Sequence, residues 1–313
     1  MPLSPPMSPC ESHDKNHSSC QSKSGRPRLL IVGCGDIGMR VLKLLAGRWQ
    51  VMALTSSPER FEALRLAGAV PVSGNLDQAD TLGRLSGWAD RVLHLAPPAP
   101  SGDTDGRTRH LLRTLVRGRL PQRLVYASTS GVYGDCGGAK FDECRPVAPS
   151  TSRAVRRVDA EGQLRHFGRQ FGVAVTILRV PGIYAADRVG GHPRDRLLRG
   201  TAVLRREDDV YTNHVHADDL ARACVLALCR GLPQRVLHVC DDSDLLMGDY
   251  FDLAAKQCGL PLPPRISRAE AREQMPPMQL SFMSESRRLS NGRLKKELRL
   301  QLRYPQALDG LSV

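Results

Sequence analysis

Long apolar runs and aromatic side chains are both scarce in this chain of 313 residues. No stretch approaches the roughly 18 uncharged apolar residues of a membrane-spanning helix, and the first residues lack the apolar core of a signal peptide. We therefore expect a soluble, cytoplasmic protein with no membrane partner. Phe, Trp and Tyr make up 4% of the sequence, and no basic run is interleaved with them. Such a composition offers little base stacking, so we expect no nucleic-acid partner.

Cysteine spacings typical of disulfide frameworks or zinc sites are also absent. The nine cysteines are odd in number and include no C-x-x-C pair and no paired Cys/His spacing. This pattern argues against both kinds of cross-link and fits a reducing cytoplasm. The formal net charge of +13 comes mainly from arginines spread along the chain, which suits a solvated basic surface and also anionic ligands.

Composition divides the chain into a tail and a globular part. Residues 1–26 are rich in Pro, Ser and Cys without apolar periodicity, so we expect a disordered tail. Short apolar runs then alternate with amphipathic stretches, which predicts an α/β fold with a doubly wound parallel (Rossmann) sheet. The expected strands are 29–32, 51–54, 70–72, 92–95, 124–127 and 173–178, and the expected crossover helices are 61–66, 81–85 and 107–116. We assign 27–180 to a nucleotide-binding domain and the less regular 181–313 to a smaller substrate-side lobe interleaved with it.

A G-x-G-x-x-G motif joins the first expected strand to a helical pattern. Gly33 permits a tight turn, Gly35 lets the backbone approach a pyrophosphate, and Gly38 lets the helix pack closely on the strand. Asp36 and Ile37 complete the motif at the helix N-terminus, whose amides face the anion. The motif predicts a dinucleotide site, and the alternative is an ordinary glycine-rich turn.

The order of motifs along the chain resembles the extended short-chain dehydrogenases, the NAD-dependent epimerase/dehydratase family. After the glycine motif come Gly-Asn-Leu at 74–76, His-Leu-Ala at 94–96, Ser-Thr-Ser-Gly-Val-Tyr-Gly at 128–134, Leu-Arg-Val-Pro-Gly-Ile-Tyr at 178–184 and Val-His-Ala-Asp-Asp-Leu at 215–220. The resemblance runs from about residue 28 to the C-terminus. It implies an NAD(P) cofactor and a small-molecule substrate. Because members of the family often dimerise through the two long helices beside the active site, it also implies a homodimer.

The resemblance also assigns cofactor contacts to particular residues. Asn75 and Leu76 stand where the family meets the adenine, although Asn75 is alternatively a turn residue. Ala96 lines the path from diphosphate to ribose, and Pro181 belongs to the motif that follows the last expected strand.

The choice of cofactor depends on the end of the second expected strand. Hydroxyls such as that of Ser56 stand there, followed by Arg60, and no acid occupies the strand end. A 2′-phosphate is therefore not repelled and can pair with Arg60. We expect NADP first and NAD second, with Glu59 as a ribose ligand if the turn is shifted.

Thr129 stands at the position of the family's catalytic Ser/Thr, whose hydroxyl holds a substrate oxygen, and is alternatively a strand-end threonine. The family's catalytic Tyr and Lys lie four residues apart on the next helix, but counting back from Glu161 finds Arg157 and Arg153. A guanidinium stays protonated and is a poor general base. This departure resembles the atypical short-chain dehydrogenases, many of which bind NAD(P) without an assigned reaction. The phenol of Tyr133, or a bound water, is then the expected proton donor.

Substrate contacts are expected from Arg153, Arg157 and Asn213. The two arginines suit an anionic ligand, and the alternative is a solvated basic helix face. His214 and His216 resemble a binary metal cluster, yet the family pattern explains their segment without a metal, so we expect none. The sequence supports two hypotheses: an NAD(P)-dependent oxidoreductase or epimerase-like enzyme, and a non-catalytic NAD(P)-binding sensor or scaffold.

Overall fold

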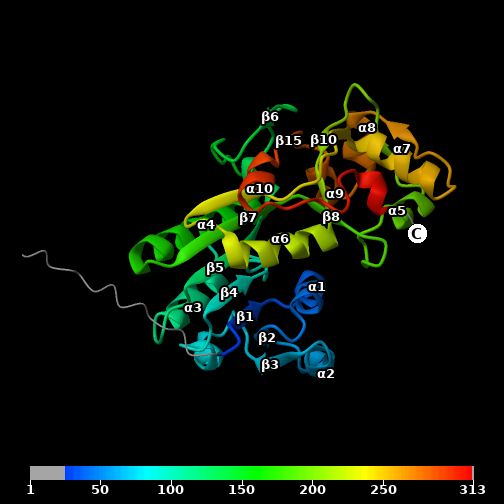
Figure 1. Cartoon of the computed structure of the whole chain (residues 1–313). Coiled ribbons are helices and arrows are strands. Elements are labelled where there is room, and N and C mark those ends of the chain that lie inside the picture. Colours follow the sequence, from blue (N-terminus) through cyan, green and yellow to red (C-terminus); the bar gives the residue numbers. More distant parts are fainter. Residues whose placement is uncertain (1–24, 312–313) are drawn as a thin grey trace, which may run out of the picture.

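The computed structural model describes residues 25–311 and is built around one parallel sheet (Figure 1). Its strands lie in the order β12-β7-β5-β4-β1-β2-β3, and every neighbouring pair is parallel. The order reverses between β1 and β4, the place where doubly wound sheets bind ligands. The predicted fold class is confirmed. The strands are β1 (Arg28–Val32), β2 (Gln50–Thr55), β3 (Ala69–Ser73), β4 (Arg91–His94), β5 (Arg123–Thr129), β7 (Ala174–Val180) and β12 (Arg235–His238).

Helices cover both faces of this sheet. Leu29 and Ile31 of β1 face one apolar core, and Leu30 and Val32 face the other, because side chains alternate along a strand. Burial on both sides explains why the strand sequences are continuous apolar runs. The first face is covered by α1 (Asp36–Leu45), α2 (Phe61–Leu66), α6 (Ala217–Arg230) and α10 (Gly292–Glu297), and the second by η2 (Ala79–Leu85), α3 (Gly106–Leu115) and α4 (Ser152–Phe171).

The predicted elements can be compared with these directly. Each of the six expected strands overlaps a strand of the sheet, and the helix expected at 61–66 coincides with α2. The stretch 81–85 forms part of a 3₁₀ helix instead of an α-helix, and Gly83 within it lowers the helix propensity. The strand β12 was not predicted, because Val236 and Leu237 make too short an apolar run between Arg235 and His238. The tail expected over 1–26 lies outside the described residues, except for residues 25 and 26.

The remaining elements form a lobe beyond the carboxyl ends of the strands (Figure 1). A third apolar core holds this lobe together, with Tyr250 and Phe251 of α7 among its buried side chains. Within residues 25–311, no helix is long and apolar enough to cross a membrane. The elements outside the sheet and its layers are η1 (Pro58–Arg60), η3 (Ser130–Tyr133), β6 (Lys140–Phe141), β8 (Gly182–Tyr184), α5 (Arg194–Leu198), β9 (Val203–Leu204), β10 (Tyr211–Thr212), β11 (His214–His216), β13 (Leu245–Leu246), α7 (Met247–Gln257), β14 (Arg265–Ile266), α8 (Arg268–Gln274), α9 (Pro277–Phe282), β15 (Arg288–Leu289) and η4 (Ala307–Gly310).

Candidate functional site

The glycine motif forms the turn from β1 into α1. Gly33 has a φ of +83°, and a Cβ there would lie 2.6 Å from the backbone nitrogen of Ala96, so this position requires glycine. Gly38 packs against Cys34, whose Sγ would lie 2.8 Å from an added Cβ. Gly35 differs, because nothing lies within 4 Å of its Cβ position. The loop is thus closed behind and open at Gly35, where a ligand can approach the backbone at the start of α1.

The end of β2 supplies the polar groups next to this loop. Thr55 Oγ1 accepts a hydrogen bond from the backbone N–H of Ser57 at 3.1 Å, which shapes the turn into η1. Arg60 is half-buried, whereas Ser56 and Glu59 are exposed. Burial raises the pKa of the Cys34 thiol to about 11, and the Arg60 guanidinium acts in the opposite direction. Arg60 therefore lies close enough to the glycine loop for its charge to act there.

Asn75 and Leu76 follow β3 in a tight turn. The Oδ1 atom of Asn75 accepts from the backbone N–H of Asp77 at 3.0 Å, and the Asn75 N–H donates to Thr81 Oγ1 at 2.8 Å. The side-chain oxygen of Asn75 is therefore used within the turn, as the alternative interpretation of Asn75 as a turn residue expects. Leu76 is buried, and its carbonyl lies 2.7 Å from Nδ1 of His110.

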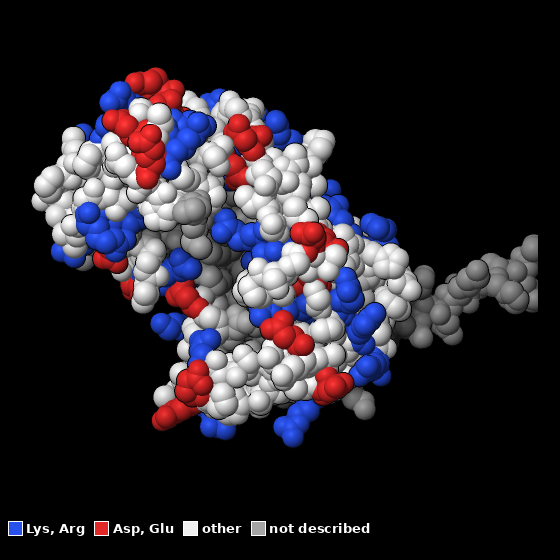
Figure 2. Space-filling model, turned by 180° about the vertical axis from the view of Figure 1, so that it is seen from behind, with Lys and Arg blue, Asp and Glu red and all other residues white. Residues whose placement is uncertain are grey.

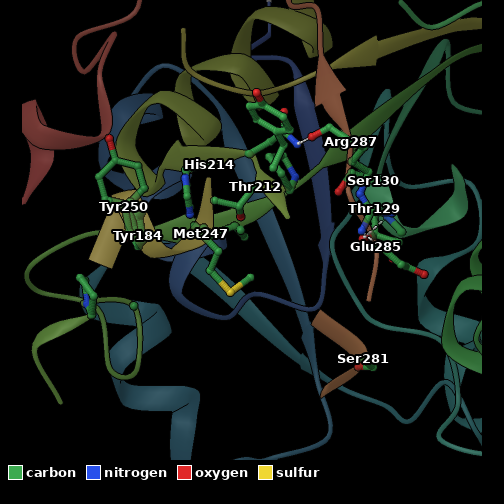
Figure 3. Close-up of a pocket in the computed structure, with 18 of the residues that line it drawn as sticks. Thr129, Ser130, Tyr184, Thr212, His214, Met247, Tyr250, Ser281, Glu285 and Arg287 are labelled. Atoms are coloured by element: carbon green, nitrogen blue, oxygen red, sulfur yellow. Dashed lines mark hydrogen bonds and ion pairs between the residues drawn. The ribbon is translucent and has the colours of Figure 1, made fainter. Parts of the chain in front are cut away.

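A cavity of about 400 Å³ lies between the carboxyl ends of β5 and β7 and the lobe (Figure 3). Thr129 lines it as the last residue of β5, where its Oγ1 accepts from the N–H of Gly131 at 3.2 Å. Three more residues line it: Arg153 on α4, Pro181 directly after β7 and Asn213 directly before β11. The fold thus brings four residues singled out in the sequence to one cavity.

Tyr133 lies elsewhere. Its side chain is 1% exposed, and its hydroxyl accepts from Arg179 at 2.6 Å and lies 2.6 Å from Nε2 of His238. Arg179 in turn forms a two-fold ion pair with Glu161, and burial raises the pKa of the Tyr133 phenol. The expectation that Tyr133 delivers a proton to the substrate is not supported by this closed position, which Thr129 does not share.

Arg157 is also turned away from the cavity. Its guanidinium donates to the hydroxyl of Tyr126 at 2.9 Å and to the carbonyl of Ala127 at 2.8 Å, both on β5. Asn213 lines the cavity, yet its amide is engaged: Nδ2 donates to the carbonyl of Arg287, and Oδ1 accepts from the N–H of Leu289. Of the three expected substrate contacts, Arg153 is the one whose charge reaches the cavity.

With the fold and the site described, the chain can be compared with proteins of known type. The model of the NAD dependent epimerase/dehydratase family matches residues 29–240. The chain belongs to this family. It is 27% identical over 240 residues to the UDP-glucose 4-epimerase of Azospirillum brasilense, a match that covers 64% of this chain and 68% of that protein.

Solved structures of similar proteins share the fold over nearly the whole chain. A functionally unknown conserved protein from Silicibacter pomeroyi is 28% identical, with a TM-score of 0.76 and coverage of 91% of this chain and 96% of the other. The dTDP-glucose 4,6-dehydratase DesIV from Streptomyces venezuelae, solved with NAD and DAU bound, is 21% identical, with a TM-score of 0.73 over 91% and 94% of the two chains. The latter likeness establishes the epimerase/dehydratase fold alone.

Several cavity residues of this epimerase/dehydratase family member were not singled out as substrate contacts in the sequence. Arg287 donates to Glu285 at 2.6 Å, and Glu285 accepts from Ser150 at 2.5 Å. Arg196 and Tyr250 come from short lobe helices that carry no recognisable motif. His214 and His216 do not converge on a metal site, because each ring stacks on a different tyrosine, Tyr250 or Tyr304. Residues 25–311 contain no cluster of three or more His, Cys, Asp or Glu arranged to hold a metal.

Proposed function

We propose that this protein is an NAD(P)-dependent oxidoreductase or epimerase-like enzyme that acts on a small anionic molecule in the cavity beside Thr129. The observation that carries the proposal is that the glycine loop and the cavity lie at the same edge of the sheet, where the parallel strands have their carboxyl ends. Gly33 packs on Ala96 at the end of β4, and the next strands outward, β5 and β7, deliver Thr129 and Pro181 to the cavity wall. The Thr129 hydroxyl would hold the substrate at this end of the strands, on the same side of the sheet as a dinucleotide bound at the glycine loop.

The charge of the cavity supports an anionic substrate. Three arginines and one glutamate line it, and the glutamate is already paired with one of the arginines. The face in Figure 2 is hollowed between the two parts of the molecule, and basic side chains stand on both sides of the hollow. An anion that enters gains charge-assisted hydrogen bonds, which are about twice as strong as neutral ones.

NADP is the proposed cofactor, with NAD as the second choice. The charge of Arg60 acts on Cys34 of the glycine loop, and the strand end before Arg60 carries Thr55 instead of an acid. A guanidinium pairs with a 2′-phosphate in two parallel hydrogen bonds, whereas an aspartate there would repel that phosphate. When bound, the cofactor would supply hydride transfer at the edge of the cavity.

The proton-transfer group is not the family's Tyr and Lys pair. None of the six tyrosines in this sequence is followed by a lysine four residues later. Arg157 cannot act as a base, since a guanidinium remains protonated in proteins. The reaction therefore needs a proton donor from another cavity residue or a bound water, and this requirement keeps the non-catalytic sensor or scaffold as the second candidate function.

Cofactor titrations test the proposal. We would titrate the purified protein with NADPH and NADH and follow fluorescence and heat, using Gly35→Asp as the blocked variant. A Cβ at Gly35 has no protein atom within 4 Å, so we expect Asp there to be tolerated and its carboxylate to repel the pyrophosphate. Gly83→Asp is the matched control for the added charge, because a Cβ at Gly83 also has no protein atom within 4 Å.

The outcomes separate the candidates. Binding that Gly35→Asp abolishes and Gly83→Asp leaves intact supports a nucleotide site, and reduction of any small oxo acid by NADPH then supports the enzyme. Binding without turnover on a panel of such acids favours the sensor. Failure of both cofactors to bind refutes the proposal. Arg60→Ala should weaken the binding of NADPH about tenfold and leave the binding of NADH unchanged. The control is Arg65→Ala, since the Arg65 side chain stacks on Phe61.

A further inference from the structure

Arg196 is a half-buried cation of the cavity wall without a carboxylate partner. Its guanidinium lies 4.5 Å from the centre of the Phe251 ring, and burial lowers its pKa. No Asp or Glu within residues 25–311 forms an ion pair with it. Arg287, another cation of the cavity wall, is held by Glu285 at 2.6 Å. A partly desolvated guanidinium that lacks such a partner is stabilised by an anion from outside.

His214 lines the same cavity and is itself incompletely bonded. Its side chain is 8% exposed, and its Nδ1 atom is buried without a hydrogen-bond partner in the part of the chain that the structure describes. The ring stacks on Tyr250 at 4.0 Å between centroids and meets the edge of Tyr184 at 6.2 Å. Burial lowers the pKa of His214 to about 4, so the imidazole is neutral at pH 7 as long as the cavity holds no anion.

Arg196 and His214 line the same cavity, and each packs against one of two consecutive residues of α7. Phe251 lies beneath Arg196, Tyr250 lies against His214, and the two rings meet edge to face at 5.4 Å. Figure 3 shows His214, Tyr250 and Tyr184 together on one side of the cavity and Thr129 on the other. A molecule that contacts the first group and Thr129 spans the cavity.

We propose that Arg196 and His214 form a proton-linked site for a small oxyanion, the carboxylate or phosphate group of the substrate. This inference rests on the proposed function, because it treats the cavity as the substrate site. Arg196 supplies the planar fork that such oxygens bind. The bound anion stabilises the imidazolium form of His214, which takes one proton from solvent as the ligand enters. His214 then holds a proton within reach of the substrate, on the side of the cavity opposite Thr129.

The other titratable groups around His214 do not account for such a proton. Tyr184 and Tyr250 are buried phenols whose pKa is raised by that burial. Asp241 donates its backbone N–H to the His214 carbonyl at 2.8 Å, and burial raises the pKa of its carboxyl to about 8, so it stays neutral at pH 7. His192, also at the cavity, is engaged at both nitrogens: Nδ1 accepts from the Arg194 N–H, and Nε2 lies 3.1 Å from the Leu311 carbonyl.

Calorimetric titration with oxalate and with inorganic phosphate tests the site. Each probe is titrated at about pH 5.5 and about pH 7.5, in two buffers that differ in ionisation enthalpy, which reports proton uptake. For the wild type we expect uptake of up to one proton and a Kd that rises by up to about tenfold per pH unit. Arg196→Gln should weaken binding by about 10- to 100-fold, whereas Arg194→Gln, exposed on the same helix, should not.

Oxalate is almost fully ionised at both pH values, so it is the probe for proton uptake: His214→Gln should bind oxalate without proton uptake and without the pH dependence, and Asp241→Asn should keep both. The preferred probe identifies the group, oxalate for a carboxylate substrate and phosphate for a phosphorylated one. Absence of proton uptake in the wild type, binding of neither probe, or equal affinities of Arg196→Gln and Arg194→Gln would each overturn the inference. NADPH titration of the same samples separates the two proposals, since loss of cofactor binding with an intact oxyanion site refutes only the proposed function.

Discussion

Glu161 is the acceptor at the centre of a buried network that holds the end of β5 in place. It receives two hydrogen bonds from Arg179, at 3.1 and 2.6 Å, and one from Ser128 at 2.7 Å. The side chains of Glu161 and Arg179 are 4% and 3% exposed. Ser128 directly precedes Thr129, so the network connects α4 and β7 to the strand end that forms the cavity wall.

Replacement of Glu161 by Met should strongly destabilise the fold, because it leaves the Arg179 guanidinium buried without its counter-charge. Breaking a buried pair from one side costs about 3–5 kcal/mol. With an entropy of unfolding of about 2.1 cal/mol/K per residue, this loss lowers Tm by about 5–8 °C in a protein of this length. Arg179→Met should cost a similar amount, since it leaves the carboxylate unpaired.

The double replacement Glu161→Met with Arg179→Met should recover part of that loss, since no buried charge then remains. Urea unfolding followed by circular dichroism measures all three variants. Asp249→Asn, which breaks the exposed pair with Arg206, is the control and should cost under about 1 kcal/mol. If each single variant loses as little as this control, the reasoning about desolvated charge is refuted.

Three further predictions concern the site, its pH response and assembly. Thr129→Val should abolish turnover of any substrate found while leaving the Kd for NADPH within about twofold, because it removes one hydroxyl hydrogen bond to the substrate; unchanged turnover would exclude Thr129 from the mechanism. Burial raises the pKa of the Asp241 carboxyl to about 8, well above its usual range, so its contribution to stability is complete below about pH 4 and is lost as pH rises towards 8. Urea unfolding at a series of pH values should show a free energy of unfolding that falls over this range, and Asp241→Asn should remove this contribution; the same fall in that variant would contradict the assignment. A dimer formed through α3 and α4 should be weak in low salt and stronger in high salt, because the exposed side chains there include Arg109, Arg113 and Arg169, whose mutual repulsion is screened by salt. Light scattering measures this, and the opposite salt dependence would contradict it.

The sheet could be predicted because its strands are buried on both faces and their sequences are therefore apolar without interruption. The glycine loop could be predicted for a related reason, since the close approach of Gly33 to Ala96 excludes any side chain. β12 was not predicted because it is the outermost strand of the sheet, and Arg235 and His238 interrupt its apolar sequence. A buried strand can thus be predicted from the sequence when all of its residues are apolar, but not when only two of them are.

The site was harder to predict because its residues come together only in three dimensions. Tyr133 and Thr129 stand four residues apart, yet the turn η3 sends the phenol into the polar network around Arg179 and leaves the threonine at the cavity. Arg196 and His214 belong to elements with no motif in common. Their relation depends on Tyr250 and Phe251, which lie far along the chain in α7.

The two arginines of α4 singled out in the sequence also bear on which group exchanges the proton. Arg157 is bound to Tyr126 and to the Ala127 carbonyl of β5, so its charge stabilises the sheet edge and cannot exchange a proton. Arg153 adds a positive charge to the cavity wall. Together with Arg196 and Arg287 it makes the cavity wall basic, which favours an anionic ligand. Under the proposed function the proton comes from a cavity residue or a bound water, and a buried neutral imidazole such as His214, whose pKa rises when an anion binds beside it, can serve as that residue.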